Sequence, residues 1–334
     1  MEDEYKADSR IKVFIPTAGV GSRLNNLTQY LNKSLVSVNN KAIISHIIEA
    51  FPKETIFVIA LGYKGELVRD YLELAHPERS FQFKTIDNFD GKKSGLGLTM
   101  HYCKELLQEP FIFVSCDTIF KGALPKLDHN WVGFSDRQDI SQYRTLRIKD
   151  KKVQEILEKN SQGNDLKPYI GLAGIFDYKA FWKEMSVNHK KAIAIGESLG
   201  LRKLIKKEIK AYYFEWFDTG NEKDLQITIK NLNKNDSVHI LQKRDEAIWL
   251  NDKIIVKFHK DKNFISNRFK RGKNLKDYVP FLSGKRKNMY AYKKVVGEVL
   301  SNNLTIPIFL KFLDHCEKFW QREQLTKLRK KEFY

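Results

Sequence analysis

The chain has 334 residues, enough for one large α/β domain and a smaller second unit, and its 42% hydrophobic and 12% aromatic content is typical of a globular protein. No apolar run reaches the roughly 20 residues of a membrane-spanning helix, the acidic residues 1–6 do not resemble a secretory signal, and three widely spaced cysteines favour a reducing cytoplasm over a disulfide framework or a zinc site. The formal net charge of +18 lies mostly in residues 237–334, with 23 Lys and Arg against 10 Asp and Glu, but no nucleic-acid-binding motif accompanies it, so we favour a solvated basic face or attraction to anionic nucleotides and lipids.

A glycine-rich loop follows the first predicted strand, residues 12–15. Gly19 and Gly21 lack a Cβ atom, so the backbone can turn sharply and approach an anion closely. Exposed N–H groups in such a loop, ahead of a helix start, form a cradle for phosphate, and Arg23 and Lys33 add two positive charges. A glycine pair after a strand is also common in ordinary turns, so this pattern alone leaves both interpretations open.

The wider string, AGVGSRL at 18–24 and NKSL at 32–35, resembles the G-x-G-[ST]-R-L and P-K-x-L signature of nucleotidyltransferases that make sugar nucleotides. Asn32 stands where that family usually has proline, and the Lys-Ser-Leu variant is typical of cytidylyltransferases that activate phosphocholine and similar alcohols. The resemblance implies that Arg23 and Lys33 are catalytic. It also implies an NTP-binding loop formed by Ala18, Gly19, Val20, Gly21 and Ser22.

Predicted strands and helices alternate through the first half of the chain. We expect strands at 55–61, 81–86 and 111–114 and helices at 42–51, 66–74 and 99–107. This alternation predicts an α/β fold with a Rossmann-like, mostly parallel mixed sheet covered by helices, the fold that the resemblance also implies. Ligands bind such sheets at the carboxyl ends of the strands, where the glycine loop lies.

Two aspartates are candidate metal ligands. Asp117 follows a predicted strand, and Asp218 lies in the aromatic segment 214–221; taken alone, either could simply cap a turn. The resemblance implies that they match the two Mg²⁺ ligands of the family, although Cys116 and Thr118 depart from the usual flanking residues. Nucleotidyl transfer brings two anionic phosphates together, and a hard dication on carboxylate oxygens offsets their repulsion. We therefore predict that Asp117 and Asp218 hold one Mg²⁺.

The acceptor site is predicted from weaker matches. Residues 153–160 resemble the E-K-P segment of the family, again with asparagine for proline, which implies that Lys159 meets the acceptor phosphate and Glu158 its hydroxyl groups. The alternative is an exposed charged strand. Gly174, in an apolar segment, would allow close approach of the acceptor, and Glu197 would match an acidic residue that contacts the sugar.

The base-reading loop of the family resembles residues 94–99, which implies a role for Gly95 in NTP binding. Leu98 replaces a polar residue often found there. A missing side-chain hydrogen bond weakens discrimination among bases, so the base is not predicted.

The last hundred residues are predicted to form a separate unit. The polar run 231–236 marks a boundary, which gives a nucleotidyltransferase domain at 1–235 and a small, basic α+β unit at 236–334. Residues 247–258 form a hairpin pattern, and residues 290–301 resemble a segment of choline-kinase and aminoglycoside-phosphotransferase-like proteins, with Lys257 at the position of their ATP lysine.

No H-x-D-x-x-x-x-N segment follows that hairpin, so the resemblance implies a kinase small lobe whose catalytic lobe is absent, in a truncated chain or a remnant without kinase activity. Residues 309–331 predict a basic amphipathic helix, with Phe309, Phe312, Phe319 and Trp320 as packing residues.

We therefore expect a cytoplasmic, Mg²⁺-dependent nucleotidyltransferase of nucleotide-sugar and cell-surface polysaccharide biosynthesis. It would join an NTP to a phosphorylated acceptor, with sugar 1-phosphate favoured, and release pyrophosphate. The alternatives are a CTP-dependent enzyme for phosphocholine or another phosphorylated alcohol, and a non-catalytic nucleotide-binding module. The expected partners are these small molecules rather than nucleic acid or a membrane, and a homo-oligomer is compatible with the resemblance.

Overall fold

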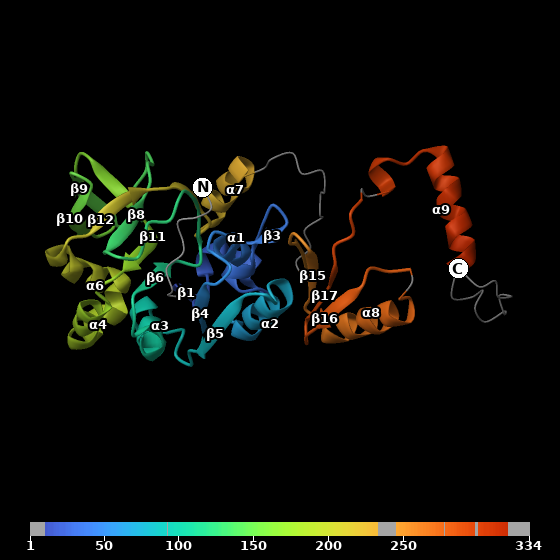
Figure 1. The fold of residues 1–334 in the computed structure, drawn as a ribbon, viewed down its shortest axis with the longest axis horizontal. Coiled ribbons are helices and arrows are strands. Elements are labelled where there is room, and N and C mark those ends of the chain that lie inside the picture. The colour runs from blue at the N-terminus through green and yellow to red at the C-terminus, as the bar shows by residue number, and fades with distance from the viewer. Residues whose placement is uncertain (1–10, 92, 233–244, 277, 298–299, 320–334) are drawn as a thin grey trace.

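The computed structural model describes residues 11–91, 93–232, 245–276, 278–297 and 300–319, and the contacts reported below are those of these residues. A nine-stranded sheet with its helices forms the larger part, and a four-stranded sheet follows it along the long axis (Figure 1). Within the described ranges, no helix combines the length and apolar character needed to cross a membrane.

The first half of the large sheet is parallel. Strands β5 (Ser80–Thr85), β4 (Ile56–Leu61), β1 (Lys12–Pro16) and β6 (Phe111–Val114) lie in that order, and all three pairings are parallel. The predicted strands and the α/β class are confirmed, and β1 and β4 are buried on both faces, as continuous apolar runs require.

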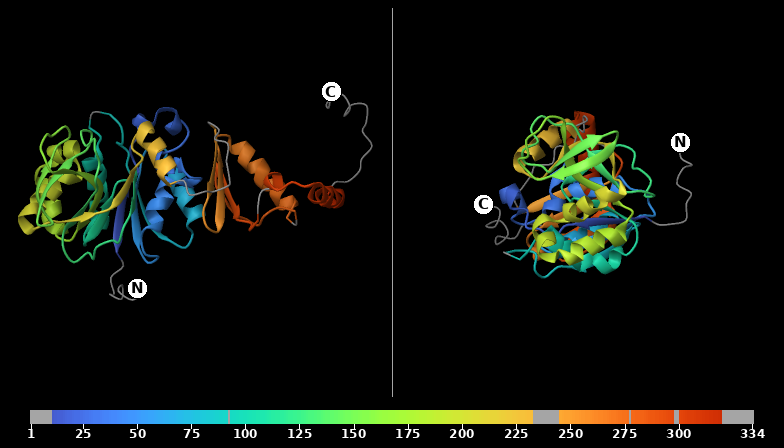
Figure 2. Two further views of the ribbon diagram at one scale, coloured as in Figure 1. Left: turned by 90° about the horizontal axis from the view of Figure 1, so that it is seen from above. Right: turned by 90° about the vertical axis from the view of Figure 1, so that its left-hand side faces the viewer.

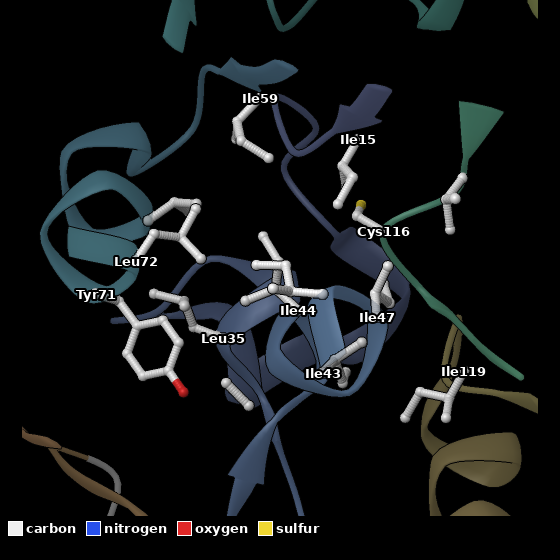
Figure 3. Packing of buried hydrophobic residues seen from close by; sticks show 14 of the residues in the cluster. Ile15, Leu35, Ile43, Ile44, Ile47, Ile59, Tyr71, Leu72, Cys116 and Ile119 are labelled. Carbon is white, nitrogen blue, oxygen red and sulfur yellow. The ribbon is translucent and has the colours of Figure 1, made fainter. Parts of the chain in front are cut away.

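Helices cover both faces of this sheet. Val13 and Ile15 belong to the core beneath α1 (Ile43–Glu49) and α2 (Gly65–Ala75), whereas Phe14 belongs to the core beneath α3 (Leu96–Cys103). Figure 3 shows part of the first of these cores. Ile44 of α1 lies on the side of Leu72, and Ile43 and Ile47 lie on the side of Ile119. Because successive side chains of β1 point to opposite faces of the sheet, this strand contributes to the core on each side.

The second half of the sheet is largely antiparallel. Strand β11 (Leu166–Ile175) runs antiparallel to β6 and is followed in the sheet by β8 (Trp131–Phe134), β12 (Lys210–Tyr213), β10 (Lys152–Leu157) and β9 (Thr145–Lys149). The helices of this half are α4 (Tyr178–Val187), α5 (His189–Ile195) and α6 (Glu197–Leu204). The predicted mixed sheet is thus present, and its parallel character is concentrated in β5, β4, β1 and β6.

A two-stranded ribbon is separate from the large sheet. Strand β7 (Thr118–Lys121) pairs antiparallel with β13 (Glu215–Asp218), and Asp218 lies opposite Thr118. Helix α7 (Glu222–Leu232) follows β13; residues 233–236 of the predicted helix lie outside the described residues. The ribbon is what brings two segments about 100 residues apart in sequence to one place.

The C-terminal sheet has the order β14 (Glu246–Leu250), β15 (Ile254–His259), β17 (Met289–Lys293) and β16 (Leu282–Lys285), with α8 (Lys262–Asn274) on one face. Its other face packs against α2, because Trp249, Val256 and Phe258 share one core with Tyr71. The Trp249 Nε1 donates to Leu35 O at 3.0 Å. The two sheets stand side by side in Figure 2.

Helix α9 (Ile306–Phe319) lies at the far end of the molecule (Figure 1). Phe309 and Phe312 are 43% and 41% exposed, so their predicted role in packing is wrong for the described structure. The reason is that this helix meets little of the described chain, chiefly at Tyr278, which stacks near His315. The side chain of Phe319 and all of Trp320 lie outside the described residues.

The remaining short elements are 3₁₀ turns and one small ribbon. The predicted helix start after the glycine loop is instead a 3₁₀ segment with a kink at Asn25, where φ is 44°. The short elements are Ser22–Thr28, Lys33–Leu35, Lys104–Leu107, Ile205–Lys207, Leu300–Asn302 and the strands β2 (Ser37–Val38) and β3 (Lys41–Ala42).

Candidate active site

The glycine loop lies at the carboxyl end of β1, as predicted. Gly21 has a φ of 74°, and a Cβ atom there would lie 2.9 Å from Cβ of Lys33, so glycine is what allows Lys33 to come close. A Cβ atom at Gly19 would meet nothing within 4 Å, which leaves the outer side of the loop open to a ligand.

Asn32, at the position where proline was expected, anchors the lysine segment. Its Nδ2 donates to the carbonyl oxygens of Thr17 and Tyr63 at 2.8 and 2.7 Å, and its Oδ1 accepts the Ser34 N–H at 3.0 Å. The side chain is fully buried. Asparagine therefore begins the 3₁₀ turn that carries Lys33 and ties this turn to the ends of two neighbouring segments.

Lys33 and Asp117 form an ion pair inside the site. Lys33 Nζ lies 3.0 Å from Asp117 Oδ2, and Ser115 Oγ donates to Asp117 Oδ1 at 2.5 Å. Burial alone would raise the pKa of Asp117, but the Lys33 ammonium and the Ser115 hydroxyl outweigh it and lower that pKa to about 2. Asp117 is therefore a carboxylate at neutral pH.

Asp218 faces the same place from the other strand of the ribbon. Its Oδ1 accepts the Gly220 N–H at 2.8 Å, and its Oδ2 accepts the Tyr143 hydroxyl at 2.6 Å. Burial and the nearby charge of Asp117 raise the pKa of Asp218 to about 6. The two carboxylates are thus close enough to repel each other.

Two carboxylates and a guanidinium group surround the space beside Gly220. A Cβ atom on Gly220 would lie 3.1 Å from Asp218 Oδ1, 3.5 Å from Asp117 Oδ2 and 3.6 Å from Arg23 Nη2. Glycine at this position therefore keeps open the space between two carboxylates and a guanidinium group. Sequence positions 23, 117 and 218 meet here as predicted.

The donor set fits Mg²⁺. Among the described residues, no cluster of three or more His, Cys, Asp or Glu side chains has the geometry of a metal site. Mg²⁺ is usually held through one or two carboxylates, with substrate phosphates and water as its other ligands. Asp117 and Asp218 provide two carboxylates at an open position, and their mutual repulsion is what a dication would relieve.

A pocket of about 180 Å³ extends from this point. Arg23, Asp117 and Asp218 line one part of it, and Lys159 and Glu197 line it too. Glu197 is 4% exposed, and within the described chain its Oε2 has no hydrogen-bond partner. The hydroxyl group of Tyr169, another lining residue, is also buried without a partner there.

Known proteins resemble this chain in sequence and fold. No family model matches it. The bifunctional protein GlmU of Methanococcus maripaludis is 25% identical over 223 residues, which cover 62% of this chain and 51% of that protein. The chain thus spans about half the length of the curated relatives it matches.

Two solved structures share the fold. One is named a glucose-1-phosphate thymidylyltransferase of Bacillus anthracis, with a TM-score of 0.58 and 18% identity over 70% of this chain and 98% of that one. The other is the CTP:phosphocholine cytidylyltransferase of Streptococcus pneumoniae, with a TM-score of 0.57 and 20% identity over 67% of this chain and 100% of that one. At these identities the comparison shows that the chain has the fold of these two nucleotidyltransferases.

Among the residues predicted to bind the acceptor or to form the base-reading loop, Glu158, Gly174 and Gly95 lie outside the lining of the pocket. Glu158 is half-exposed and bonds Arg144 and Arg202 at 3.2 and 2.6 Å. A Cβ atom at Gly174 would lie 2.1 Å from Trp131 Nε1, so this glycine makes room for the indole. A Cβ atom at Gly95 would clash with a carbonyl oxygen of α5 at 2.4 Å. Packing explains the last two glycines.

The residues of the glycine loop lead into Arg23 and are not part of the pocket lining: Ala18, Gly19, Val20, Gly21 and Ser22. Lys33 is also outside the lining and reaches the site through its ion pair with Asp117. Several lining residues were not predicted from the sequence. Tyr143 and Arg144 lie in a segment without a motif, and Tyr169 and Gly171 lie in β11, where only the glycine three residues later was singled out. Alternate residues of a strand share a face, so Tyr169 and Gly171 could have been paired, but nothing in sequence shows which face is open.

Proposed function

We propose that the chain is a nucleotidyltransferase that joins an NTP to a phosphorylated acceptor and releases pyrophosphate. Sugar 1-phosphate is the acceptor class we favour. The observation that carries this proposal is the convergence of Asp117, Asp218 and Arg23 on one open point, at a pocket that Lys159 also lines.

The reaction would be a single in-line displacement at the α-phosphorus of the NTP. The attacking oxygen belongs to the acceptor phosphate and is already anionic, so no protein nucleophile is required. Lys159 would hold this phosphate, while Arg23 and Lys33 would stabilise the negative charge that moves onto the leaving pyrophosphate. Catalysis then consists of positioning and charge stabilisation.

Asp117 and Asp218 are the residues that would hold Mg²⁺. When bound there, the ion supplies positive charge between the two phosphate groups. Lys33 Nζ lies 3.0 Å from Asp117 Oδ2. If Asp117 also held Mg²⁺, the Lys33 ammonium group would still lie close to the substrate phosphates. The Ser115 hydroxyl keeps the Asp117 carboxylate oriented.

Two unpaired buried atoms support a polyhydroxylated acceptor. Glu197 Oε2 and the Tyr169 hydroxyl line the pocket without a partner among the described residues, and such buried groups cost about 1–3 kcal/mol each when left unsatisfied. Sugar hydroxyl groups would satisfy both. This chemistry supports sugar 1-phosphate.

A phosphocholine-like acceptor with CTP is the second candidate. The pocket lining contains the aromatic rings of Tyr143, Tyr169 and Trp216 together with the acidic Glu197. Aromatic faces and a carboxylate attract a quaternary ammonium group. The Lys33-Ser34-Leu35 variant of the signature agrees with this alternative.

Pyrophosphate release tests the proposal. The purified chain would be assayed with each of the four NTPs, with Mg²⁺, against a panel of sugar 1-phosphates, phosphocholine and other phosphorylated alcohols. We expect one combination to stand out, and we expect Asp117→Asn and Asp218→Asn each to lower its turnover on the order of 100-fold or more, since a charged group in the transition state is lost.

The controls separate the outcomes. Thermal melting should show that both variants are folded at the temperature of the assay. Turnover of Asp218→Asn near the parent value would remove the metal assignment. NTP binding without turnover on any acceptor would instead identify a non-catalytic nucleotide-binding module.

We further propose that residues 236–334 form a distinct unit without kinase activity, in a cytoplasmic enzyme. The unit's own sheet supports the division, and Lys257, on β15, pairs with Glu246 at 3.5 Å. The three cysteines are free and buried, which agrees with a reducing compartment. Phosphorylation of choline or a sugar by the purified chain with ATP would contradict the absence of kinase activity.

A further inference from the structure

A cluster of polar side chains contacts Asp218 and extends to helix α7. It joins the loop between β8 and β9, which carries Arg137, Gln142 and Tyr143, to Asp224 on α7. None of these four residues belongs to a motif that the sequence offers. Their contacts, however, all lead to the carboxylate of Asp218.

The hydrogen bonds of the Tyr143 hydroxyl determine where its proton points. Arg137 Nη1 donates to this oxygen at 2.6 Å, and Gln142 Nε2 donates to it at 2.9 Å. Both lone pairs are therefore used, and the single hydroxyl proton is left for a carboxylate. Asp218 Oδ2 is the nearest, at 2.6 Å, whereas Asp224 Oδ2 lies at 3.3 Å.

This bond fixes which oxygen of Asp218 faces the open site. Oδ2 is held by Tyr143, and Oδ1 is the atom nearest the point where Asp117 and Arg23 converge. The Gly220 N–H also bonds Oδ1 at 2.8 Å, so the carboxylate is held at both ends. A carboxylate held at both oxygens cannot rotate freely.

Arg137 in turn fixes Tyr143. Its Nη2 bonds Asp224 Oδ1, its Nη1 lies 3.6 Å from Asp218 Oδ2, and its guanidinium carbon lies 5.1 Å from the centre of the Tyr143 ring. The same group lies 5.4 Å from the centre of the Trp216 ring, which meets Tyr143 edge to face at 4.9 Å. Asp224 is itself held by Asn221 Nδ2 at 2.6 Å.

We propose that Tyr143 and Arg137 are positioning residues that direct the Asp218 carboxylate toward Asp117, so that the two can share a divalent cation. This inference rests on the proposed function for its purpose, although the geometry stands by itself. Partners that orient a metal ligand change metal affinity or activity by about 10–100-fold when they are removed.

A purely structural role would give a different result. In that case loss of the Tyr143 hydroxyl would lower the melting temperature and leave cation binding unchanged. The deciding quantity is therefore the affinity for a divalent cation, measured directly and not through turnover.

The test is Mn²⁺ binding to the full chain, followed by electron paramagnetic resonance, for the parent and for Tyr143→Phe. This change removes one oxygen and keeps the ring that packs against Trp216. Tyr212→Phe is the matched control, because its hydroxyl also has a hydrogen bond, to His129 at 3.0 Å, but it lies outside the pocket lining. We expect Tyr143→Phe to raise the dissociation constant of Mn²⁺ by about 10-fold or more and Tyr212→Phe to leave it unchanged.

Arg137→Lys is the second variant. If Tyr143→Phe does not fold, the Mn²⁺ affinity of Arg137→Lys tests the inference. Lysine keeps the charge but cannot bridge Asp224 and Tyr143 as the guanidinium fork does. We expect a smaller loss of Mn²⁺ affinity than with Tyr143→Phe. In the pyrophosphate assay, both variants should need more Mg²⁺ for half-maximal rate.

Parent-like Mn²⁺ affinity in a folded Tyr143→Phe or Arg137→Lys protein would overturn the inference, and so would an equal loss in Tyr212→Phe. Failure of the proposed function is seen separately, as absence of pyrophosphate release by the parent chain. Mn²⁺ binding and its dependence on Tyr143 would still be measured in that case.

Discussion

At the scale of single residues, Asp117 and Asp218 are chemically alike but are placed in opposite surroundings. Lys33 and Ser115 lower the pKa of Asp117 to about 2, after the opposing effect of its burial. Burial and the charge of Asp117 raise the pKa of Asp218 to about 6. The same carboxylate group therefore stabilises the fold in one position and destabilises it in the other.

This difference predicts how stability depends on pH in the absence of divalent cations. Because the pKa of Asp218 rises from 3.8 to about 6 on folding, its protonated form is favoured in the folded state, and stability is lost as the pH rises through that window. Asp218→Asn carries no charge and avoids this loss. We expect its melting temperature to exceed that of the parent by a margin that grows from pH 4 to pH 6 and then levels off.

Thermal melts of both proteins at pH 4, 5, 6 and 7 in a chelating buffer would measure the margin. A margin that stays constant across this range would show that Asp218 has an ordinary pKa in the folded protein. Added Mg²⁺ should reduce the margin, because the parent alone keeps both carboxylates.

At the scale of elements, the glycine loop and the lysine turn depend on each other. Gly21 has a left-handed backbone, and a Cβ atom there would press against Lys33, while the space beside Gly19 is open. We expect Gly21→Ala to destabilise the fold by more than about 1 kcal/mol and to displace Lys33. Gly19→Ala is the matched control and should fold as the parent does.

Denaturant unfolding of the two alanine variants would compare these positions, and nucleotide binding would report on the loop. Equal stability of both variants would mean that Lys33 can move aside without cost. A stable Gly19→Ala protein with weaker nucleotide binding would agree with a ligand lying over the open side of the loop.

The sequence predicts these elements unevenly. The strands of the parallel half are predicted well because β1, β4 and β6 are short, continuous apolar runs and β5 has an alternating pattern, and both patterns are typical of strands. Asp117, Asp218 and Arg23 are predicted because they stand in recognisable motifs. Tyr143 and Arg137 are not, because their role arises from a loop that meets α7 across about 80 residues of chain, and no local pattern reports that contact. Gly174 is misleading, since a glycine that packs under Trp131 resembles one that admits a ligand.

At the scale of the whole molecule, the C-terminal sheet and the large sheet with its helices share one core. Trp249 is fully buried, packs on Tyr71 with ring centres 4.7 Å apart, and donates its indole N–H to Leu35 O. Leu35 belongs to the turn that carries Lys33. The C-terminal sheet therefore supports the turn that carries Lys33 to the candidate active site.

Trp249→Ala tests this coupling. Loss of a large buried aromatic side chain costs about 3–5 kcal/mol, so we expect a marked fall in melting temperature and a single transition for the whole protein. Phe281→Ala is the control, because Phe281 is 73% exposed and should have little effect. Two separate transitions in the parent chain would instead show that the units unfold independently.

The shared core also has a practical consequence for anyone who trims the protein. Ser45 bonds both Tyr71 and His76 at 2.7 Å, and Tyr71 also reaches Asn251 at 3.4 Å, so a buried polar chain ends on the hairpin of the second unit. A fragment that stops near residue 235 would bare that chain and the apolar side of α2 together, and it should be prone to aggregate. A fragment that ends after β17 would keep both the polar chain and the apolar side of α2 covered. If a chain shorter than the full protein is wanted for assays, this fragment is the one to choose.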